Sequence, residues 1–409
     1  MRGYASGERN DNNTLFNSSA VAITPYRSLE NPLRWRGVQV KDVIKLGRQA
    51  VTVGATYNEA RSTSQRFNSA GAGITPFSPN FELNTTSFYA QGQLSLLAGK
   101  VVLTPGARVD FITYRTLETA LLASFAPSQH TYPVVSPSLG AQAELLPDLR
   151  AHATIGRGYI VPEAAYVAGI SQVVSAAGTP RTVALVQSNP DLHNETSLSW
   201  DAGLRFDRPA TGFAADVTYF ATRVSDRITT RTTNPVGETT PDGSLVRSRT
   251  TYLNADDSRI QGLEVEASYD VGALAGHRYV LRVFVGGTRN FQFSDVATNA
   301  DGSQSSRPVF NVAPLSGNYG VAFDSRHGVR ARLAGHYVGS RLDTDFIDTR
   351  APQIDYPAYM TLDFSAAYTL AKRHTFTLQV GNLTDENYYE KRGYNLPGRN
   401  WTGGYALTF

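Results

Sequence analysis

Four residues near the carboxyl end have side chains suited to holding an anionic or aryl-bearing ligand. Tyr388, Tyr389, Arg392 and Tyr394 lie within seven residues of one another. Tyrosine rings stack on aryl groups, and a guanidinium donates charge-assisted hydrogen bonds to anions. The same residue types also form aromatic girdles and solvated loops. The sequence leaves both interpretations open, and the first makes these four residues the candidate ligand-binding set.

Two further groups of residues could bind a metal but lack the required spacing. Oxygen ligands for a hard cation are offered by Asp343, Asp345, Asp348 and Asp355. Their spacing matches no defined calcium loop, so an ordinary solvated loop is favoured. The histidines, including His152, His193 and His336, are dispersed and give no pair at metal-ligand spacing. We therefore assign no metal site and no cofactor, and haem uptake gains no support.

Composition and motifs argue against an enzyme or a nucleic-acid-binding protein. The chain has no cysteine, which excludes a thiolate site or a cysteine nucleophile. It contains neither a G-x-S-x-G elbow nor a phosphate-binding G-x-x-x-x-G-K-[ST] loop. The formal charge is +3 without a basic block, so no nucleic-acid partner is expected.

In the segments that must position these residues, apolar and polar side chains alternate with a period of two. From Thr196 to Phe206, one face carries Leu198, Trp200 and Leu204, and the other carries charged and small polar residues. About 15 such segments follow from residue 33, the last two at 372–387 and 398–409, and a weaker one covers 14–24. We predict that one face turns outward, with Trp200, Leu204, Phe206, Phe213, Tyr219, Phe364 and Leu407. The other face turns inward, with Asp201, Arg205, Asp216, Arg330 and Asp363.

The connections between these segments alternate between short and long. Short turns are expected near 46–47, 146–148, 207–210, 324–327 and 370–371. Long polar loops are expected near 61–82, 115–130, 159–193, 231–250, 292–307, 340–356 and 388–397. Tight turns on one rim and long loops on the other are typical of an outer-membrane barrel. We therefore predict an all-β fold, a transmembrane antiparallel β-barrel of 15 or 16 strands, surrounded by outer-membrane lipid.

Several stretches resemble barrel signatures of the TonB-dependent outer-membrane receptor family. They are 156–163 (GRGYIVPE), 189–196 (NPDLHNET), 254–266 (NADDSRIQGLEVE) and 380–388 (VGNLTDENY), followed by 397–401 and the terminal Phe409. The resemblance covers about residues 33–409. It implies a receptor that imports a scarce chelated nutrient, most simply a ferric siderophore, with energy from an inner-membrane TonB complex. It also implies that Tyr405, Leu407 and Phe409 form the signal read by the barrel-assembly machinery.

Two departures from the family pattern make us expect a partial barrel. Neither a signal peptide nor a plug domain is recognisable, and family barrels have about 22 strands. We divide the chain into a poorly defined segment 1–32, which holds one strand at most, and a partial barrel 33–409. An open edge in lipid would leave backbone groups unpaired. We therefore expect a gap or an irregular seam between the N-terminal strands and residues 380–409, and no transport by the chain alone. The alternative function is a passive porin-like channel.

Overall fold

The fold was analysed in a computed structural model. The structure describes residues 2–17, 23–76, 79–122, 127–167, 170–176, 181–241, 243–298, 303–345, 347–348 and 352–409. Within these ranges, no helix is long and apolar enough to cross a membrane.

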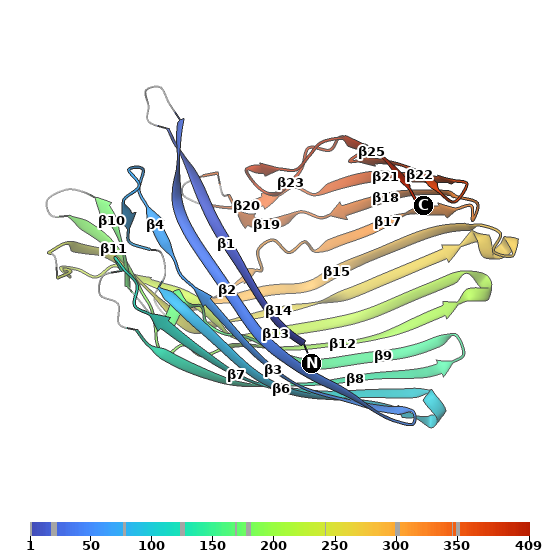
Figure 1. The fold of residues 1–409 in the computed structure, drawn as a ribbon, viewed down its shortest axis with the longest axis horizontal. Coiled ribbons are helices and arrows are strands. Elements are labelled where there is room, and N and C mark those ends of the chain that lie inside the picture. The colour runs from blue at the N-terminus through green and yellow to red at the C-terminus, as the bar shows by residue number, and fades with distance from the viewer. Residues whose placement is uncertain are drawn as a thin grey trace.

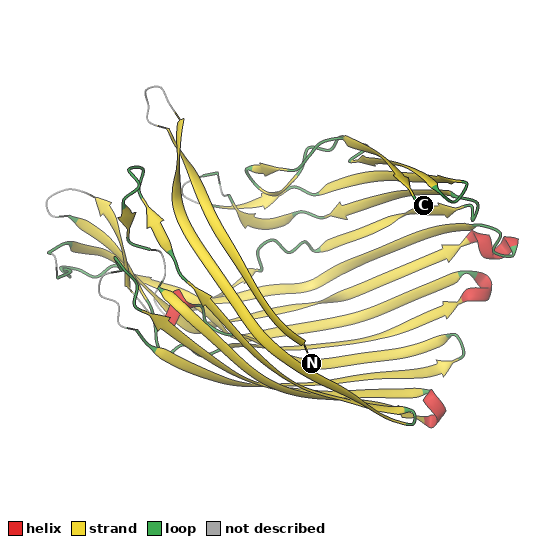
Figure 2. Cartoon of the chain, viewed as in Figure 1, coloured by secondary structure: helices red, strands yellow, loops and turns green. Residues whose placement is uncertain are grey.

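One curved sheet forms the wall of the molecule (Figures 1 and 2). Of its 21 strands, β4, β5, β10, β11 and β16 belong to the loops, and the other 16 follow one another around the wall. The wall strands are β1 (Arg2–Asn17), β2 (Ile23–Leu46), β3 (Gln49–Ser62), β6 (Asn80–Leu96), β7 (Val101–Leu117), β8 (Gln129–Leu146), β9 (Leu149–Ile160), β12 (Glu195–Arg208), β13 (Phe213–Thr233), β14 (Leu245–Asp270), β15 (Val280–Thr298), β17 (Leu315–Asp324), β18 (Val329–Val338), β21 (Tyr359–Leu370), β22 (His374–Gly381) and β25 (Asn400–Leu407).

Each wall strand pairs antiparallel with the next one along the chain. At one rim the connections are tight, as at Gly47, or single turns of 3-10 helix such as η1 (Leu97–Gly99), η2 (Pro209–Thr211) and η3 (Val271–Ala275). Figure 2 shows these turns together on the right and the long loops on the left. The predicted all-β antiparallel wall with one rim of short turns is therefore confirmed.

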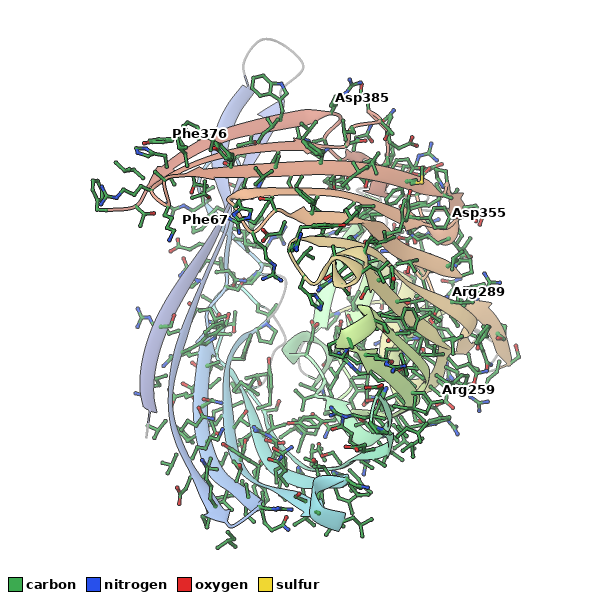
Figure 3. All side chains as sticks on the ribbon, turned by 90° about the vertical axis from the view of Figure 1, so that its right-hand side faces the viewer. Phe67, Arg259, Arg289, Asp355, Phe376 and Asp385 are labelled. Atoms are coloured by element: carbon green, nitrogen blue, oxygen red, sulfur yellow. The ribbon has the colours of Figure 1, made fainter. Side chains whose placement is uncertain are left out.

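The predicted facing of the side chains is also confirmed. Arg259 and Phe376 point away from the enclosed space in Figure 3. Directly paired residues on neighbouring strands share a face of the sheet. Arg259 pairs with Arg223, and Arg223 pairs with Leu198, so Leu198 also faces outward. Trp200 and Leu204 follow Leu198 at even spacing in β12 and therefore face outward as well. Arg205 pairs with Asp216 on the opposite, inner face. The alternation of apolar and polar residues could be recognised in the sequence because, in a barrel of this kind, one face of each strand meets lipid and the other meets water.

The N-terminal part and one late strand differ from the sequence-based expectation. Two strands, β1 and β2, lie where we expected at most one, and the expected strand at 14–24 is wrong because it spans the end of β1 and the start of β2. Residues 18–22 lie outside the described residues. The division into domains at residue 33 stays a prediction, although β2 runs across it. The expected strand 372–387 was too long, because Asn382 has a φ of 49° and ends β22 at Gly381.

The two ends of the sheet are not joined in the part of the chain that the structure describes. There, β1 pairs with β2, β25 pairs with β22, and no ladder connects β1 to β25. In Figure 1 the blue hairpin β1–β2 runs at an angle to the red strands. The expected gap is therefore confirmed as an unpaired edge on each side.

The long-loop half of the inner face has its own apolar core. Ile112, Tyr114, Tyr132 and Val134 from β7 and β8 pack against Val167 and Leu192 of the loop after β9. This loop contains α1 (Ala164–Val167), β10 (Ile170–Ala176) and β11 (Thr182–Gln187), and β11 pairs parallel with β14. Other loops carry β4 (Gln65–Phe67), β5 (Gly73–Ile74) and β16 (Gln304–Pro308). Much of what the sequence predicted as loop is thus folded.

Candidate ligand-binding loops at the long-loop rim

Two small hairpins carry the candidate residues at the long-loop rim. The loop after β18 forms β19 (Arg341–Thr344) and β20 (Gln353–Tyr356), and the loop after β22 forms β23 (Tyr389–Lys391) and β24 (Tyr394–Asn395). The first hairpin is closed by a bond from the Asp345 N–H to the Pro352 carbonyl, at 2.8 Å. The second is closed by a 3.0 Å bond from the Leu396 N–H to the Tyr388 carbonyl.

Arg341 ties three loops together at this rim. Its side chain is only 5% exposed. Its Nε donates to Asn311 Oδ1 at 2.6 Å, in the loop before β17, and its Nη2 donates to the Glu390 carbonyl at 3.2 Å. The guanidinium carbon lies 5.4 Å from the ring centre of Tyr356 and 5.8 Å from that of Tyr359. Cation–π contacts of this kind strengthen when the cation is desolvated, as it is here.

Three of the four candidate residues join this cluster. The ring of Tyr389 meets Tyr356 edge-on at 5.2 Å, and the ring of Tyr388 lies 4.6 Å from Tyr359. Arg392 pairs with Asp345 at 3.0 Å, and its backbone N–H donates to Tyr356 Oη at 3.0 Å. Burial raises the pKa of Tyr388, and the carboxylates of Asp363 and Glu390 raise it further. Its hydroxyl therefore stays protonated further into the alkaline range than that of an exposed tyrosine.

Tyr394 differs from the other three candidates. It is 71% exposed at the tip of the second hairpin. The structure thus brings Tyr388, Tyr389 and Arg392 together and leaves Tyr394 facing solvent. The sequence missed Arg341, Tyr356 and Tyr359, because their partners lie on other loops and no local spacing shows it.

The aspartates considered for a cation are used within the same loops. Asp345 accepts the Ile347 N–H at 3.0 Å besides pairing with Arg392. Asp343 accepts the Thr344 N–H at 2.7 Å, and Asp355 of β20 is directly opposite Leu342 of β19 and is labelled in Figure 3. Within the described ranges, no three His, Cys, Asp or Glu side chains are grouped so that they could hold a metal ion.

The stretches that resemble family signatures hold loops to the wall. Asn254 receives the His193 N–H at 3.0 Å and donates to the carbonyls of His193 and Asp226 at 2.9 and 2.7 Å. Asn189 donates to the Tyr252 carbonyl at 2.9 Å. These amides supply partners for backbone groups where two loops leave the sheet, which explains why asparagine stands at both positions.

The same use of asparagine recurs in the stretch 380–388. Asn382 is 4% exposed, and its side chain donates to the Glu386 and Pro397 carbonyls at 2.8 and 3.3 Å. Its Oδ1 accepts the Glu386 N–H at 2.9 Å. Asp385 accepts the Arg399 N–H at 2.7 Å. This stretch therefore fixes the return of the last loop to β25.

A protein-family model described as "TonB dependent receptor-like, beta-barrel" matches residues 2–383. The chain belongs to this family of outer-membrane proteins. The family consists of receptors rather than enzymes, as the sequence predicted.

Solved structures support the fold of this receptor barrel. The siderophore receptor PirA from Acinetobacter baumannii has a TM-score of 0.66 at 18% identity, covering 99% of this chain and 59% of that one. The copper transporter OprC has a TM-score of 0.70 at 15% identity, covering 99% and 61%.

Curated relatives vary in what they transport. The vitamin B12 transporter BtuB of Vibrio vulnificus is 28% identical over 52% of this chain and 30% of its own length. The heme/hemopexin utilization protein C of Haemophilus influenzae is 24% identical over 88% of this chain and 49% of its own length. The chain spans half or less of the length of these relatives.

The last strand of the receptor barrel carries the residues expected to be the assembly signal. Tyr405 pairs with Phe376, with ring centres 5.2 Å apart, and its hydroxyl lies 2.8 Å from His374 Nδ1. Leu407 pairs with His374, and Phe409 is fully exposed beyond the end of β25. Their role as a signal stays a prediction.

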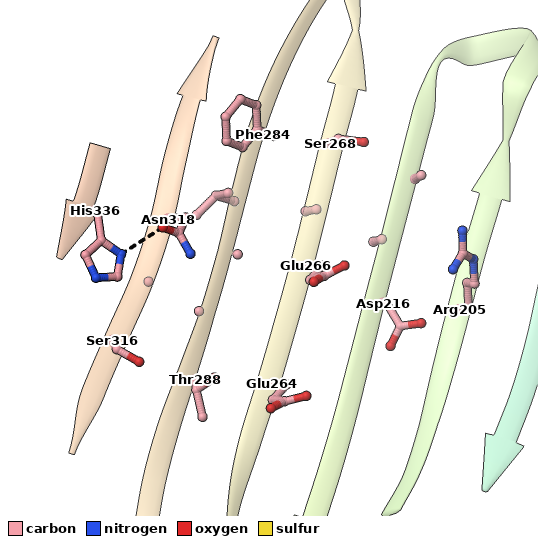
Figure 4. A pocket seen from close by; sticks show the side chains of 17 residues that line it. Arg205, Asp216, Glu264, Glu266, Ser268, Phe284, Thr288, Ser316, Asn318 and His336 are labelled. Atoms are coloured by element: carbon pink, nitrogen blue, oxygen red, sulfur yellow. Dashed lines mark hydrogen bonds between the residues drawn. The ribbon is translucent and has the colours of Figure 1, made fainter. Parts of the chain in front are cut away.

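The inner wall of the barrel is polar, with a depression of about 500 Å³ over β12 to β18. Figure 4 shows Arg205, Asp216, Glu264 and Glu266 projecting into it from neighbouring strands, and His336 bonded to Asn318 at 2.8 Å. Two other arginines of the inner face have partners within the wall: Arg108 pairs with buried Asp110 at 2.8 Å, and the guanidinium carbon of Arg332 lies 5.0 Å from the ring centre of Phe284.

Proposed function

We propose that this barrel belongs to a receptor that imports a metal chelate, most simply a ferric siderophore, across the outer membrane. The observation that carries the proposal is the cluster at the long-loop rim, where two loops share aromatic rings and guanidinium groups and a third loop contributes the Asn311 amide. Aromatic faces and cations together suit an anionic, aryl-bearing chelate better than a free ion. Tyr394, exposed beside this cluster, is the residue placed to make first contact.

Relatives support a chelate as the class of ligand. They include a metal-pseudopaline receptor of Pseudomonas aeruginosa, 26% identical over 58% of this chain, and ferric enterobactin receptor structures have the same fold. A vitamin B12 transporter and a heme/hemopexin utilization protein are also relatives. The histidines of this chain are dispersed along the sequence, and His152 lies 3.4 Å from Asp216, so haem gains no comparable support. Energy for import would come from the TonB complex, as membership of the family implies.

Growth of a receptor-deleted strain on single iron sources tests the ligand class. The full-length gene should restore growth on at least one ferric siderophore and not on haem. Tyr394→Ala should weaken binding of that siderophore several-fold, whereas Val236→Ala, fully exposed in a different loop, should have no effect. Growth restored on haem or vitamin B12 alone would contradict the siderophore proposal and leave the receptor assignment intact.

A further inference from the structure

An ion pair between a buried carboxylate and a partly exposed guanidinium joins the two hairpins of the rim cluster. Arg392 Nη1, on the turn of the β23–β24 hairpin, lies 3.0 Å from Oδ2 of Asp345, the residue after β19. Asp345 is 7% exposed, whereas 43% of the Arg392 side chain is exposed. The carboxylate therefore neutralises, from the protein side, a cation that solvent and a ligand can reach.

The two oxygens of Asp345 have separate partners. Oδ1 accepts the Ile347 N–H at 3.0 Å, in the turn between β19 and β20. Oδ2 pairs with the guanidinium of Arg392. An asparagine at this position would keep the first contact through its amide oxygen, but its NH2 group cannot accept a hydrogen bond from a guanidinium. The turn and the ion pair can therefore be separated by a single substitution.

Arg341, in the same cluster, has a donor that is not used. Its Nε and Nη2 donate to Asn311 and to the Glu390 carbonyl, but its buried Nη1 has no hydrogen-bond partner among the described residues. A buried N–H without a partner costs free energy. Because Nη1 is covered by the cluster, an acceptor from a ligand can reach it only when the hairpins separate.

Tyr356 connects the two arginines. The guanidinium carbon of Arg341 lies 5.4 Å from its ring centre, and the Arg392 N–H donates to its hydroxyl at 3.0 Å. The ring of Tyr389 meets the same ring edge-on. A ligand that reaches Arg392 is therefore next to aromatic rings and to a second guanidinium, a combination that suits an anionic aryl-bearing chelate.

A second ion pair near this rim lacks these features. Arg399 Nη2 lies 3.8 Å from Asp385 Oδ2, and the two side chains are 55% and 56% exposed. Both residues belong to the loop between β22 and β25, so this pair does not join two loops. Ion pairs that are open to water on both sides contribute little. The buried carboxylate and the crossing between loops thus distinguish the Asp345–Arg392 pair.

We propose that Asp345 is an internal competitor of the chelate. In the ligand-free receptor its carboxylate occupies Arg392, and on binding a negatively charged oxygen of the chelate becomes the partner of this guanidinium instead. Loss of the ion pair lets the hairpins separate, so that Arg341 Nη1 gains an acceptor from the same ligand. A chelate without negative charge offers Arg392 no replacement partner and leaves the hairpins closed. The inference rests on the proposed function, because it concerns the same cluster, and it adds how that cluster selects anionic ligands.

Equilibrium binding to the full-length protein tests this role, with the ferric siderophore that restores growth of the receptor-deleted strain as the probe. Asp345→Asn removes the competing charge and keeps the turn. A partly exposed ion pair is worth up to about 1 kcal/mol, so affinity should rise about threefold to fivefold. Arg392→Gln should weaken binding about tenfold, because a charge-assisted hydrogen bond to the chelate is lost.

A double variant and a matched control separate competition from a general effect of charge. Asp345→Asn added to Arg392→Gln should leave affinity within about twofold of that of Arg392→Gln alone, because the carboxylate then has no guanidinium to occupy. Asp257→Asn removes the same charge from an ion pair with Arg223 at 2.8 Å on another part of the wall. In this control, affinity should change less than about twofold.

Hydrogen exchange without siderophore shows whether the variant keeps its fold. Exchange at 391–393 should be faster in Asp345→Asn, while 353–356 should keep its protection. If the asparagine variant fails to assemble, Asp345→Ser keeps a hydroxyl acceptor for the turn and should also bind more tightly.

The outcomes separate this inference from the proposed function. A wild-type receptor that binds no ferric siderophore would contradict the proposed function. Binding by the wild type without a gain in either Asp345 variant would overturn this inference alone. A gain that persists in the double variant, or a gain of equal size in Asp257→Asn, would also overturn it.

Discussion

The loop after β9 and the loops around Arg341 are held at the same rim by different means. The first buries Val167 and Leu192 in the apolar core of the inner face and closes its ends with the amides of Asn189 and Asn254. The second depends on one buried guanidinium between aromatic rings. Moving the first loop would expose buried apolar side chains to water, which costs free energy. In the second set, a ligand can replace the hydrogen bonds and ring contacts that a loop movement breaks. We infer that the second set of loops is the one that responds to a ligand.

The largest expected effect comes from removing the cation at the centre of the second set. Arg341→Ala breaks two charge-assisted hydrogen bonds and two ring contacts, so the loops should lose about 3 kcal/mol or more of local stability. Hydrogen exchange should rise at 353–356 and 389–395. Arg341→Lys, which keeps the charge without the fork geometry, should show an intermediate rise. Unchanged protection in Arg341→Ala would mean that the ring packing alone holds these loops.

Next in size is the loss of the amide that anchors the first set. Asn254→Ala removes three hydrogen bonds to backbone groups, and at about 1 kcal/mol each the loss should approach 2–3 kcal/mol. Limited proteolysis should then cleave near 189–194, while cleavage at 389–395 should not change. Equal sensitivity at both sites would show that the two sets of loops are not independent.

A smaller effect is expected from the hydroxyl of Tyr356. It donates to the Thr344 carbonyl at 2.7 Å and accepts the Arg392 N–H at 3.0 Å. Tyr356→Phe keeps the ring under Arg341 and should cost about 1–2 kcal/mol, measured by hydrogen exchange at 391–393. A loss of local stability as large as that in Arg341→Ala would show that this hydroxyl provides most of the stabilisation of the cluster.

The smallest effect on stability should come from Tyr394→Ala. Its side chain is 71% exposed, so local stability should change by less than about 0.5 kcal/mol. Siderophore binding should nevertheless weaken. If thermal unfolding shifts as much as binding does, Tyr394 is part of the loop packing and not a ligand contact.

The wall could be predicted from the sequence because lipid and water impose opposite demands on alternate residues. Trp200 and Asp201 show this directly. The N-terminal hairpin was missed because β1 is rich in Asn and Gly and has little apolar alternation. The end of β22 was missed because the positive φ of Asn382 depends on bonds to Glu386 and Pro397.

The rim cluster could be predicted only in part. Tyr388, Tyr389 and Arg392 were found by residue type, but their contacts with Tyr356, Tyr359 and Asp345 come from a different loop. Contacts between loops depend on how the barrel brings the ends of the loops together. The spacing of residues within one loop therefore does not predict them. Residue type alone therefore did not separate Tyr394, which faces solvent, from neighbours that hold the loops.

Uptake of a radiolabelled ferric siderophore by cells that express the full-length protein tests the central claim most directly. The siderophore is the one identified by growth, and uptake is compared in cells with and without an intact TonB system. We predict saturable uptake that is lost without TonB and in cells treated with an uncoupler. Equal, non-saturable uptake in both strains would contradict the account and favour a passive channel.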